Sequence, residues 1–141
     1  MLIASLFAKK KKAEQKRMLN LNIWGRSVEV EVVYDVRCGE KVSREQQYAL
    51  ERFLSDSERI FSIAEEKAKD YCLGVNGEDI GEKTISNIFK YVVPKAILVN
   101  RSEGVRTVAL LCHYKFNMDD GLAIVFENEA FSQIGSEDII L

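Results

Sequence analysis

The chain has 141 residues, of which 47% are hydrophobic and 30% charged, with one proline and eight glycines. This composition is typical of a globular domain and excludes a disordered or fibrous chain. A net charge of −2, with an excess of positive charge at one end and an acidic remainder, argues against nucleic-acid binding by the folded part. No apolar run approaches the roughly 20 residues of a transmembrane helix.

The cysteine content favours a reduced, cytoplasmic protein. Cys38, Cys72 and Cys112 are far apart in the sequence and form no C-x-x-C pair. A disulfide framework needs an even set of cysteines, and a structural zinc site needs close ligands, whereas this chain has a single histidine. We therefore expect neither a metal site nor a cofactor.

Residues 1–18 form a basic segment ahead of a single domain over residues 19–141. The segment has six basic residues and one acidic residue, a charge of +5, so the rest of the chain carries −7. It fits either a solvated leader or a short amphipathic membrane contact, in which apolar residues insert and lysines meet anionic lipid. The membrane contact would consist of Leu2, Ile3, Leu6, Phe7, Lys9, Lys10, Lys11 and Lys12.

Two segments with alternating hydrophobicity follow, at residues 19–24 and 28–36. Alternation rich in β-branched residues is the signature of strands, and a turn beginning at Gly25 predicts a β-hairpin with one solvated face. The polar side of the hairpin is either a solvated face or a surface for a protein partner. The candidate partner-binding residues are Trp24, Glu29, Glu31 and Asp35.

Residues 43–72 change to helical spacing, with apolar side chains at steps of three and four. Ser43 with Gln46, and Ser55 with Glu58, match the capping box in which a serine and a later side chain satisfy backbone donors. The pattern predicts two helices that divide near Ser55.

A glycine-rich loop is expected over residues 73–82, followed by a third helix over residues 85–92. This helix must end before Pro94, because proline disfavours α geometry at the residue before it. The glycines of the loop lack the spacing of a phosphate-binding motif.

The C-terminal part predicts strands at residues 95–100, 105–116 and 122–127, with short extended pieces at 131–135 and 138–141. Both faces of 105–116 carry apolar residues, which places this strand in the centre of the sheet, covered on one side by helices. We therefore expect an α+β fold with a mainly antiparallel sheet and about three helices packed on one face.

His113 is the one candidate for acid–base catalysis, with Asp119 or Asp120 as a partner. Cys112 is next to it in the sequence, but neighbouring strand residues point to opposite faces, so the two cannot act as a dyad. Asp119 and Asp120 precede Gly121 and fit turn chemistry better than a metal site, which needs more oxygen ligands. The alternative is a purely structural interpretation: His113 is a strand residue, Cys112 belongs to the core, and Asp119 and Asp120 form an acidic turn.

The last third of the chain resembles a group of uncharacterised bacterial domains. The shared residues are the stretch "GLAIVF" from Gly121 to Phe126, "IG" at Ile134 and Gly135, and "DIIL" from Asp138 to Leu141. The group often has Glu-His before the glycine, where this chain has Asp119 and Asp120. The resemblance implies no activity. Small α+β domains of this kind are associated with immunity to bacterial toxins, which favours a binding module.

Three functions follow, in order of preference. The first is a non-catalytic protein-interaction module, of which a toxin-immunity protein is one type. The second is a small hydrolase or ligand-binding enzyme that uses His113 with Asp119 or Asp120. The third is a membrane-peripheral adaptor held by residues 1–18.

Overall fold

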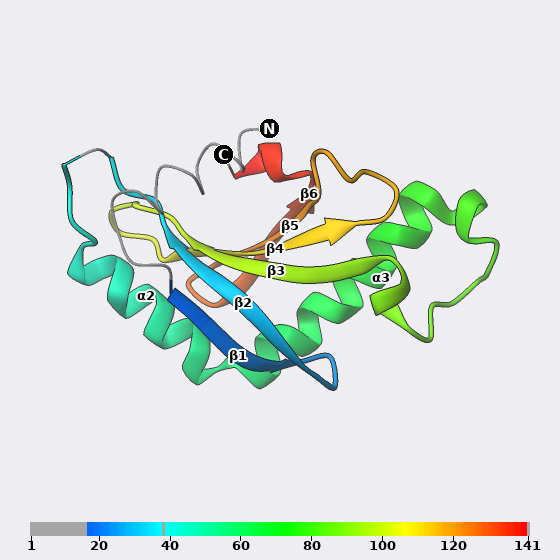
Figure 1. The fold of residues 1–141 in the computed structure, drawn as a ribbon, viewed down its shortest axis with the longest axis horizontal. Helices are drawn as coiled ribbons and strands as arrows, with labels where there is room; N and C mark the ends of the chain where they lie inside the picture. Colours follow the sequence, from blue (N-terminus) through cyan, green and yellow to red (C-terminus); the bar gives the residue numbers. More distant parts are fainter. Residues whose placement is uncertain (1–16, 38, 141) are drawn as a thin grey trace.

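The computed structural model describes residues 17–37 and 39–140 as one six-stranded sheet with two α-helices on one side (Figure 1). The α+β class is confirmed. The predicted membrane-contact residues 2–12 lie outside the described residues. Arg17 and Met18, which the sequence assigns to the basic segment, are the first residues of the first strand.

The strands lie side by side in the order of the sequence. They are β1 (Arg17–Ile23), β2 (Arg26–Tyr34), β3 (Val92–Val99), β4 (Thr107–Tyr114), β5 (Leu122–Glu127) and β6 (Ala130–Gly135). Four of the five pairings are antiparallel, whereas β2 and β3 are parallel. The parallel pair is joined by α2 (Arg44–Ser55) and α3 (Ser57–Ile80), which cross one face of the sheet. A parallel pair needs such a long crossover, because the end of the first strand and the start of the second lie at opposite ends of the strands.

The β1–β2 hairpin turns at Trp24 and Gly25, which have φ angles of 53° and 82°. Two successive positive φ angles are the mark of the turn type that matches the twist of a hairpin. Trp24 therefore belongs to the turn. The prediction that it lies on the polar side of a strand is wrong. Its Nε1 donates to the backbone oxygen of Phe61 at 2.8 Å, and its ring meets Phe89 edge to face.

The division into two helices near Ser55 is confirmed. Ser43 and Gln46 form the predicted capping box at the start of α2. The second predicted box is wrong: Asp56 precedes α3 and makes no side-chain cap. The predicted loop at 73–82 is also wrong, because α3 continues to Ile80 through a kink at Asn76.

The sequence predicts three helices, and the third is absent from the described part. Only a short 3-10 turn, η1 (Ile88–Lys90), forms there, and β3 begins at Val92. Pro94 lies within β3, although proline has no N–H to donate to a neighbouring strand. A bulge between Pro94 and Ala96 shifts the register at this point, and proline is tolerated in strands at bulges. The final residues form another 3-10 turn, η2 (Glu137–Ile139), and not an extended piece.

The sheet has apolar side chains on both faces. The face that packs on α2 and α3 holds the larger cluster, which includes Phe53, Phe61 and Phe126 in edge-to-face contact. We call the opposite side the far face. It holds a smaller cluster of buried side chains: Val33, Ala96, Leu98, Ala109, Leu111, Ala123 and Val125. β4 lies near the centre of the sheet, as predicted.

Candidate functional site

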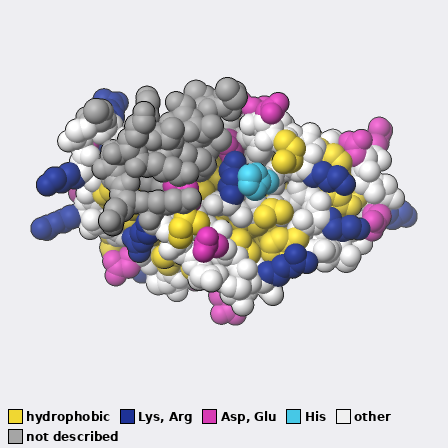
Figure 2. All heavy atoms as spheres, viewed as in Figure 1, with side chains coloured by type: hydrophobic (Ala, Val, Ile, Leu, Met, Phe, Trp, Pro, Cys, Tyr) yellow, Lys and Arg dark blue, Asp and Glu magenta, His cyan; other side chains and the backbone are white. Residues whose placement is uncertain are grey.

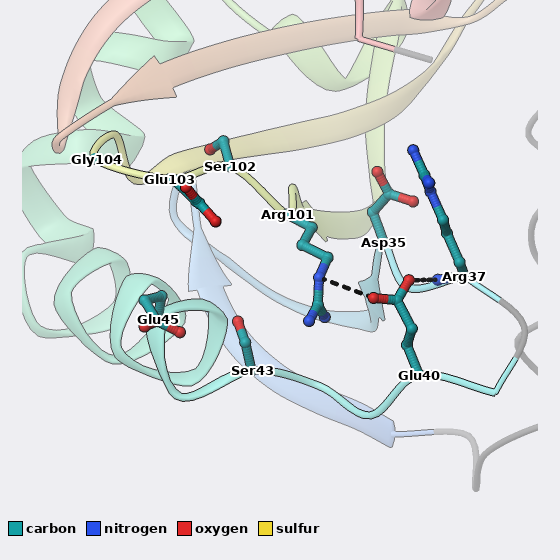
Figure 3. A pocket seen from close by; sticks show the side chains of 9 residues that line it. All are labelled: Asp35, Arg37, Glu40, Ser43, Glu45, Arg101, Ser102, Glu103 and Gly104. Atoms are coloured by element: carbon teal, nitrogen blue, oxygen red, sulfur yellow. Dashed lines mark hydrogen bonds and ion pairs between the residues drawn. The ribbon is translucent and has the colours of Figure 1, made fainter.

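A polar cleft opens beyond the carboxyl ends of β2 and β3, the parallel pair. Its volume is about 650 Å³. Figure 3 shows that three segments line it: the chain after β2, the start of α2 and the loop between β3 and β4. Ligand sites of open α/β sheets commonly lie at this end of parallel strands. The lining residues are Asp35, Arg37, Glu40, Ser43, Glu45, Arg101, Ser102, Glu103 and Gly104.

The buried side chain of Gln46 joins the three segments behind the cleft. Its Nε2 donates to the backbone oxygens of Asp35 at 3.0 Å and Val99 at 3.3 Å, the positions where β2 and β3 stop pairing. Its Oε1 accepts from the backbone nitrogen of Ser43 at 3.0 Å. One amide thus bonds to backbone groups of all three segments, although the oxygen of Val99 also accepts from the backbone nitrogen of Asp35 at 3.0 Å.

Arg101 closes one side of the cleft. Its Nη1 donates to the backbone oxygen of Lys41 at 2.9 Å, and its Nε lies 3.5 Å from Oε2 of Glu40. Glu40 also accepts from the backbone nitrogen of Arg37 at 3.2 Å through Oε1. These contacts are drawn in part in Figure 3 and leave the Arg101–Glu40 pair neutral as a unit.

The remaining charges of the cleft are mostly negative. Asp35, Glu45 and Glu103 are exposed, and none of their carboxylates forms an ion pair or a hydrogen bond with another described residue. Arg37 is the one cationic side chain in the lining besides Arg101. The cleft therefore presents an acidic surface, with unpaired acceptors contributed by three separate segments.

His113 and Cys112 lie on opposite sides of the sheet. Cys112 is fully buried in the helix-side cluster, and burial raises the pKa of its thiol far above the usual value. A thiol in that state is neither a nucleophile nor a metal ligand. His113 is exposed on the far face, where Figure 2 shows the imidazole next to a cationic side chain. The strand alternation had predicted this separation.

Asp119 and Asp120 lie in the exposed turn between β4 and β5. Asp120 and Asn117 form a local turn, with the backbone nitrogen of Asp120 donating to Oδ1 of Asn117 at 3.3 Å. The backbone nitrogen of Gly121 donates to the oxygen of Asn117 at 2.9 Å. These are the contacts of a structural turn.

A second polar group, which the sequence analysis missed, lies on the far face beside His113. Lys95 Nζ is 2.8 Å from Oε1 of Glu137, whose side chain is 2% exposed. Lys95 is the one described residue that forms an ion pair with Glu137. Burial raises the pKa of the Glu137 carboxyl, and Lys95 opposes this shift. Partial burial and repulsion from Lys95 both lower the pKa of His113.

The four candidate partner-binding residues do not share one surface. Trp24 packs on the helix side, whereas Glu29 and Glu31 project from β2 on the far face, because Val30 and Val32 between them face the helices. Asp35 lies beyond the strand, in the cleft. Of these residues, only Asp35 takes part in the candidate site.

Within residues 17–37 and 39–140, no three His, Cys, Asp or Glu side chains are grouped as metal ligands. None of the helices in these ranges has the length and apolar character to cross a bilayer.

No curated protein and no solved structure matches the chain. A family described as a domain of unknown function, DUF6985, matches residues 6–141. The match covers almost the full length and all of the sheet, both helices and the cleft. The chain therefore belongs to the DUF6985 family of domains of unknown function.

Proposed function

We propose that the protein is a non-catalytic protein-interaction module that binds a basic segment of a partner protein in the cleft. One observation carries the proposal: Asp35, Glu45 and Glu103, from three segments, surround one opening, and no described residue forms an ion pair with their carboxylates. Such an arrangement costs electrostatic free energy in the free protein and is relieved by a cationic partner. The open, charged lining suits a protein surface better than a small apolar ligand.

Gln46 supports this role because it holds the backbone of all three segments in place. The acidic side chains are therefore arranged before a partner arrives, which lowers the entropy cost of binding. A toxin-immunity protein, which sequesters one partner, is one form of such a module and is the form that the sequence resemblance favours.

The enzymatic alternative depends on His113 acting with Asp119 or Asp120. The buried thiol next to His113 points into the other side of the sheet, and Asp120 is engaged in its own turn. A hydrolytic activity that His113→Ala abolishes would favour the alternative over the module.

The proposal is tested with the full chain and a seven-residue lysine peptide, with a glutamate peptide of equal length as the control. We expect the lysine peptide to shift backbone amide NMR signals around Asp35, Ser43 and Glu103, and the shifts to shrink with added salt. The triple variant Asp35→Asn/Glu45→Gln/Glu103→Gln should lose this response.

A matched variant changes the charge by the same amount elsewhere. Glu66→Gln/Asp70→Asn/Glu82→Gln removes three exposed carboxylates from α3 and the residues after it. It should retain the response of the unmodified chain. Shifts centred outside the cleft, or equal loss in both triple variants, would contradict the proposed site. For the immunity form, co-expression with the toxin of a neighbouring gene should protect cells, and the cleft variant should not.

A further inference from the structure

The far face of the sheet forms an apolar floor that crosses four strands, β2 to β5. Its seven side chains are 0–1% exposed, and three of them are alanines. Four adjacent strands span about 14 Å at the usual spacing of about 4.8 Å. We call this cluster the apolar floor: Val33, Ala96, Leu98, Ala109, Leu111, Ala123 and Val125.

The described residues supply little to cover this floor. Outside the cluster, Ile140 is the one described hydrophobic side chain packed against it. The two α-helices of the described residues, α2 and α3, pack on the opposite face (Figure 1). A single isoleucine cannot cover a floor four strands wide, and a sheet with apolar residues on both faces needs a layer on each.

We propose that residues 1–16 of the same chain form this third layer, with Leu2, Ile3, Leu6 and Phe7 packed on the apolar floor. The inference does not depend on the proposed function, because the floor and the cleft are separate surfaces. It identifies the N-terminal segment as an intramolecular partner of the sheet and not as a membrane contact.

The segment of residues 1–16 is joined to the sheet close to the apolar floor. Residue 16 leads directly into Arg17, which pairs with Val32, and the next residue, Val33, belongs to the floor. Sixteen residues measure about 24 Å as a helix and more when extended, so the segment can cross the roughly 14 Å of the floor.

The side-chain sizes of the floor and of the segment are complementary. Ala96, Ala109 and Ala123 occupy three neighbouring strands, and their small side chains leave space above the sheet. Close packing at protein density requires large side chains opposite such positions. Residues 2–7 supply two leucines, an isoleucine and a phenylalanine.

The charges are complementary as well. Residues 1–16 contain five lysines and one glutamate. The far face carries Glu29 and Glu31 on β2, next to the point where the segment enters the sheet. At the other end of the floor, Glu137 has a buried carboxylate, and the one described ion-pair partner of this group is Lys95. An apolar segment with adjoining lysines matches an apolar floor with acidic groups at its edges.

The test uses cysteine accessibility in the full chain with Cys38→Ser as background. Ala109→Cys probes the floor, and Val93→Cys, at a residue 41% exposed, probes an open position. A maleimide should label Ala109→Cys at least about tenfold more slowly than Val93→Cys, as expected for a site that opens only transiently. Adding Leu6→Asp/Phe7→Asp should raise the Ala109→Cys rate by about tenfold or more.

Two controls separate docking from other effects. Ala13→Asp/Gln15→Asp adds the same charge beyond the apolar stretch and should leave the rate unchanged. The native Cys72 and Cys112, which are buried on the helix side, should stay unlabelled if the sheet remains folded. If they react, the milder pair Leu6→Ala/Phe7→Ala replaces the aspartates and must raise the rate in the same direction.

Other results would overturn the inference. Rapid labelling of Ala109→Cys in the unmodified segment means that the floor is open, and slow labelling that neither Leu6 nor Phe7 controls means that another element covers it. A rate that falls as the protein concentration rises assigns the floor to a second copy. Strong co-sedimentation of the unmodified chain with vesicles of phosphatidylglycerol, lost in Leu6→Asp/Phe7→Asp, assigns the apolar residues to a membrane.

Discussion

The carboxylate of Glu137 lies against the backbone of Gly121. A Cβ atom on residue 121 would be 2.7 Å from Oε1 of Glu137 and 2.8 Å from the backbone oxygen of Cys112. Gly121 has a φ angle of 63°, and its backbone ends the turn that leads into β5. The turn, the end of β4 and η2 therefore meet at a point that admits no side chain.

Gly121→Ala should destabilise the fold by about 2–4 kcal/mol, because a left-handed backbone and two close contacts would act together. Urea unfolding monitored by Trp24 fluorescence measures the effect. Removing the Glu137 carboxylate cannot fully rescue the variant, since the oxygen of Cys112 belongs to the backbone of β4.

Gly77→Ala is the matched control for that variant. Gly77 lies in α3, and apart from its chain neighbours and the backbone of its own helix no atom lies within 4 Å of the position its Cβ would take. Alanine there should stabilise the protein by about 0.5–1 kcal/mol through its higher helix propensity. Equal effects of the two substitutions would show that the contact at Gly121 is relaxed in solution.

Gln46→Ala should cost about 2–4 kcal/mol, because it removes the Nε2 donor to the backbone oxygen of Asp35 and opens a cavity. The neighbouring Gln47 is exposed, and Gln47→Ala should change the free energy of unfolding by less than about 0.5 kcal/mol. If Gln46→Ala folds, amide exchange should rise at the carboxyl ends of β2 and β3 before it rises elsewhere. Uniform exchange across the sheet would contradict the local role of Gln46.

Local patterns in the sequence predicted much of the sheet. The alternation at 28–36 and 105–116 corresponds to β2 and β4, and the Ser43–Gln46 capping box forms as expected. The prediction of a third helix is wrong because the apolar residues of 85–92 belong to a 3-10 turn and to the first residue of β3. Pro94 misled the prediction, since a bulge lets a strand accommodate it.

The cleft could not be predicted in the same way. Asp35 and Arg101 are 66 positions apart, and only the parallel pairing of β2 with β3 brings their segments together. No local pattern indicates that pairing. The capping box did identify Gln46, but it could not show that the same amide also reaches the two strand ends.

Glu129→Gln should weaken the protein at neutral pH and remove part of its acid sensitivity. Arg106 donates to both oxygens of Glu129, at 2.7 and 2.9 Å, and these hydrogen bonds lower the pKa of the carboxyl below 4.5. The pair therefore contributes stability that is present above about pH 4.5 and is lost as the pH falls through the lowered pKa.

Urea unfolding of the two proteins at pH 7 and pH 3 checks this expectation. The difference in free energy of unfolding between the native chain and Glu129→Gln should shrink on acidification. Glu66→Gln, at an exposed position on α3, serves as the control and should show a small difference at both pH values. A constant difference for Glu129→Gln would mean that the carboxyl does not change its protonation on unfolding.

The single histidine allows a direct measurement of the field on the far face. Lys95 lowers the pKa of His113, so Lys95→Gln should raise it, and one imidazole proton signal followed by NMR reports the change without ambiguity. Lys115 lies two residues after His113 in the sequence. Lys115→Gln is the control and should change the pKa of His113 less than Lys95→Gln does. Because the folded pKa lies below 6.5, His113 favours the folded state above that pH and loses this contribution as the pH falls. Lys95→Gln should therefore flatten the decline in stability below about pH 6.5, whereas an unchanged His113 pKa would show that the Lys95 ammonium stays with Glu137 and away from the imidazole.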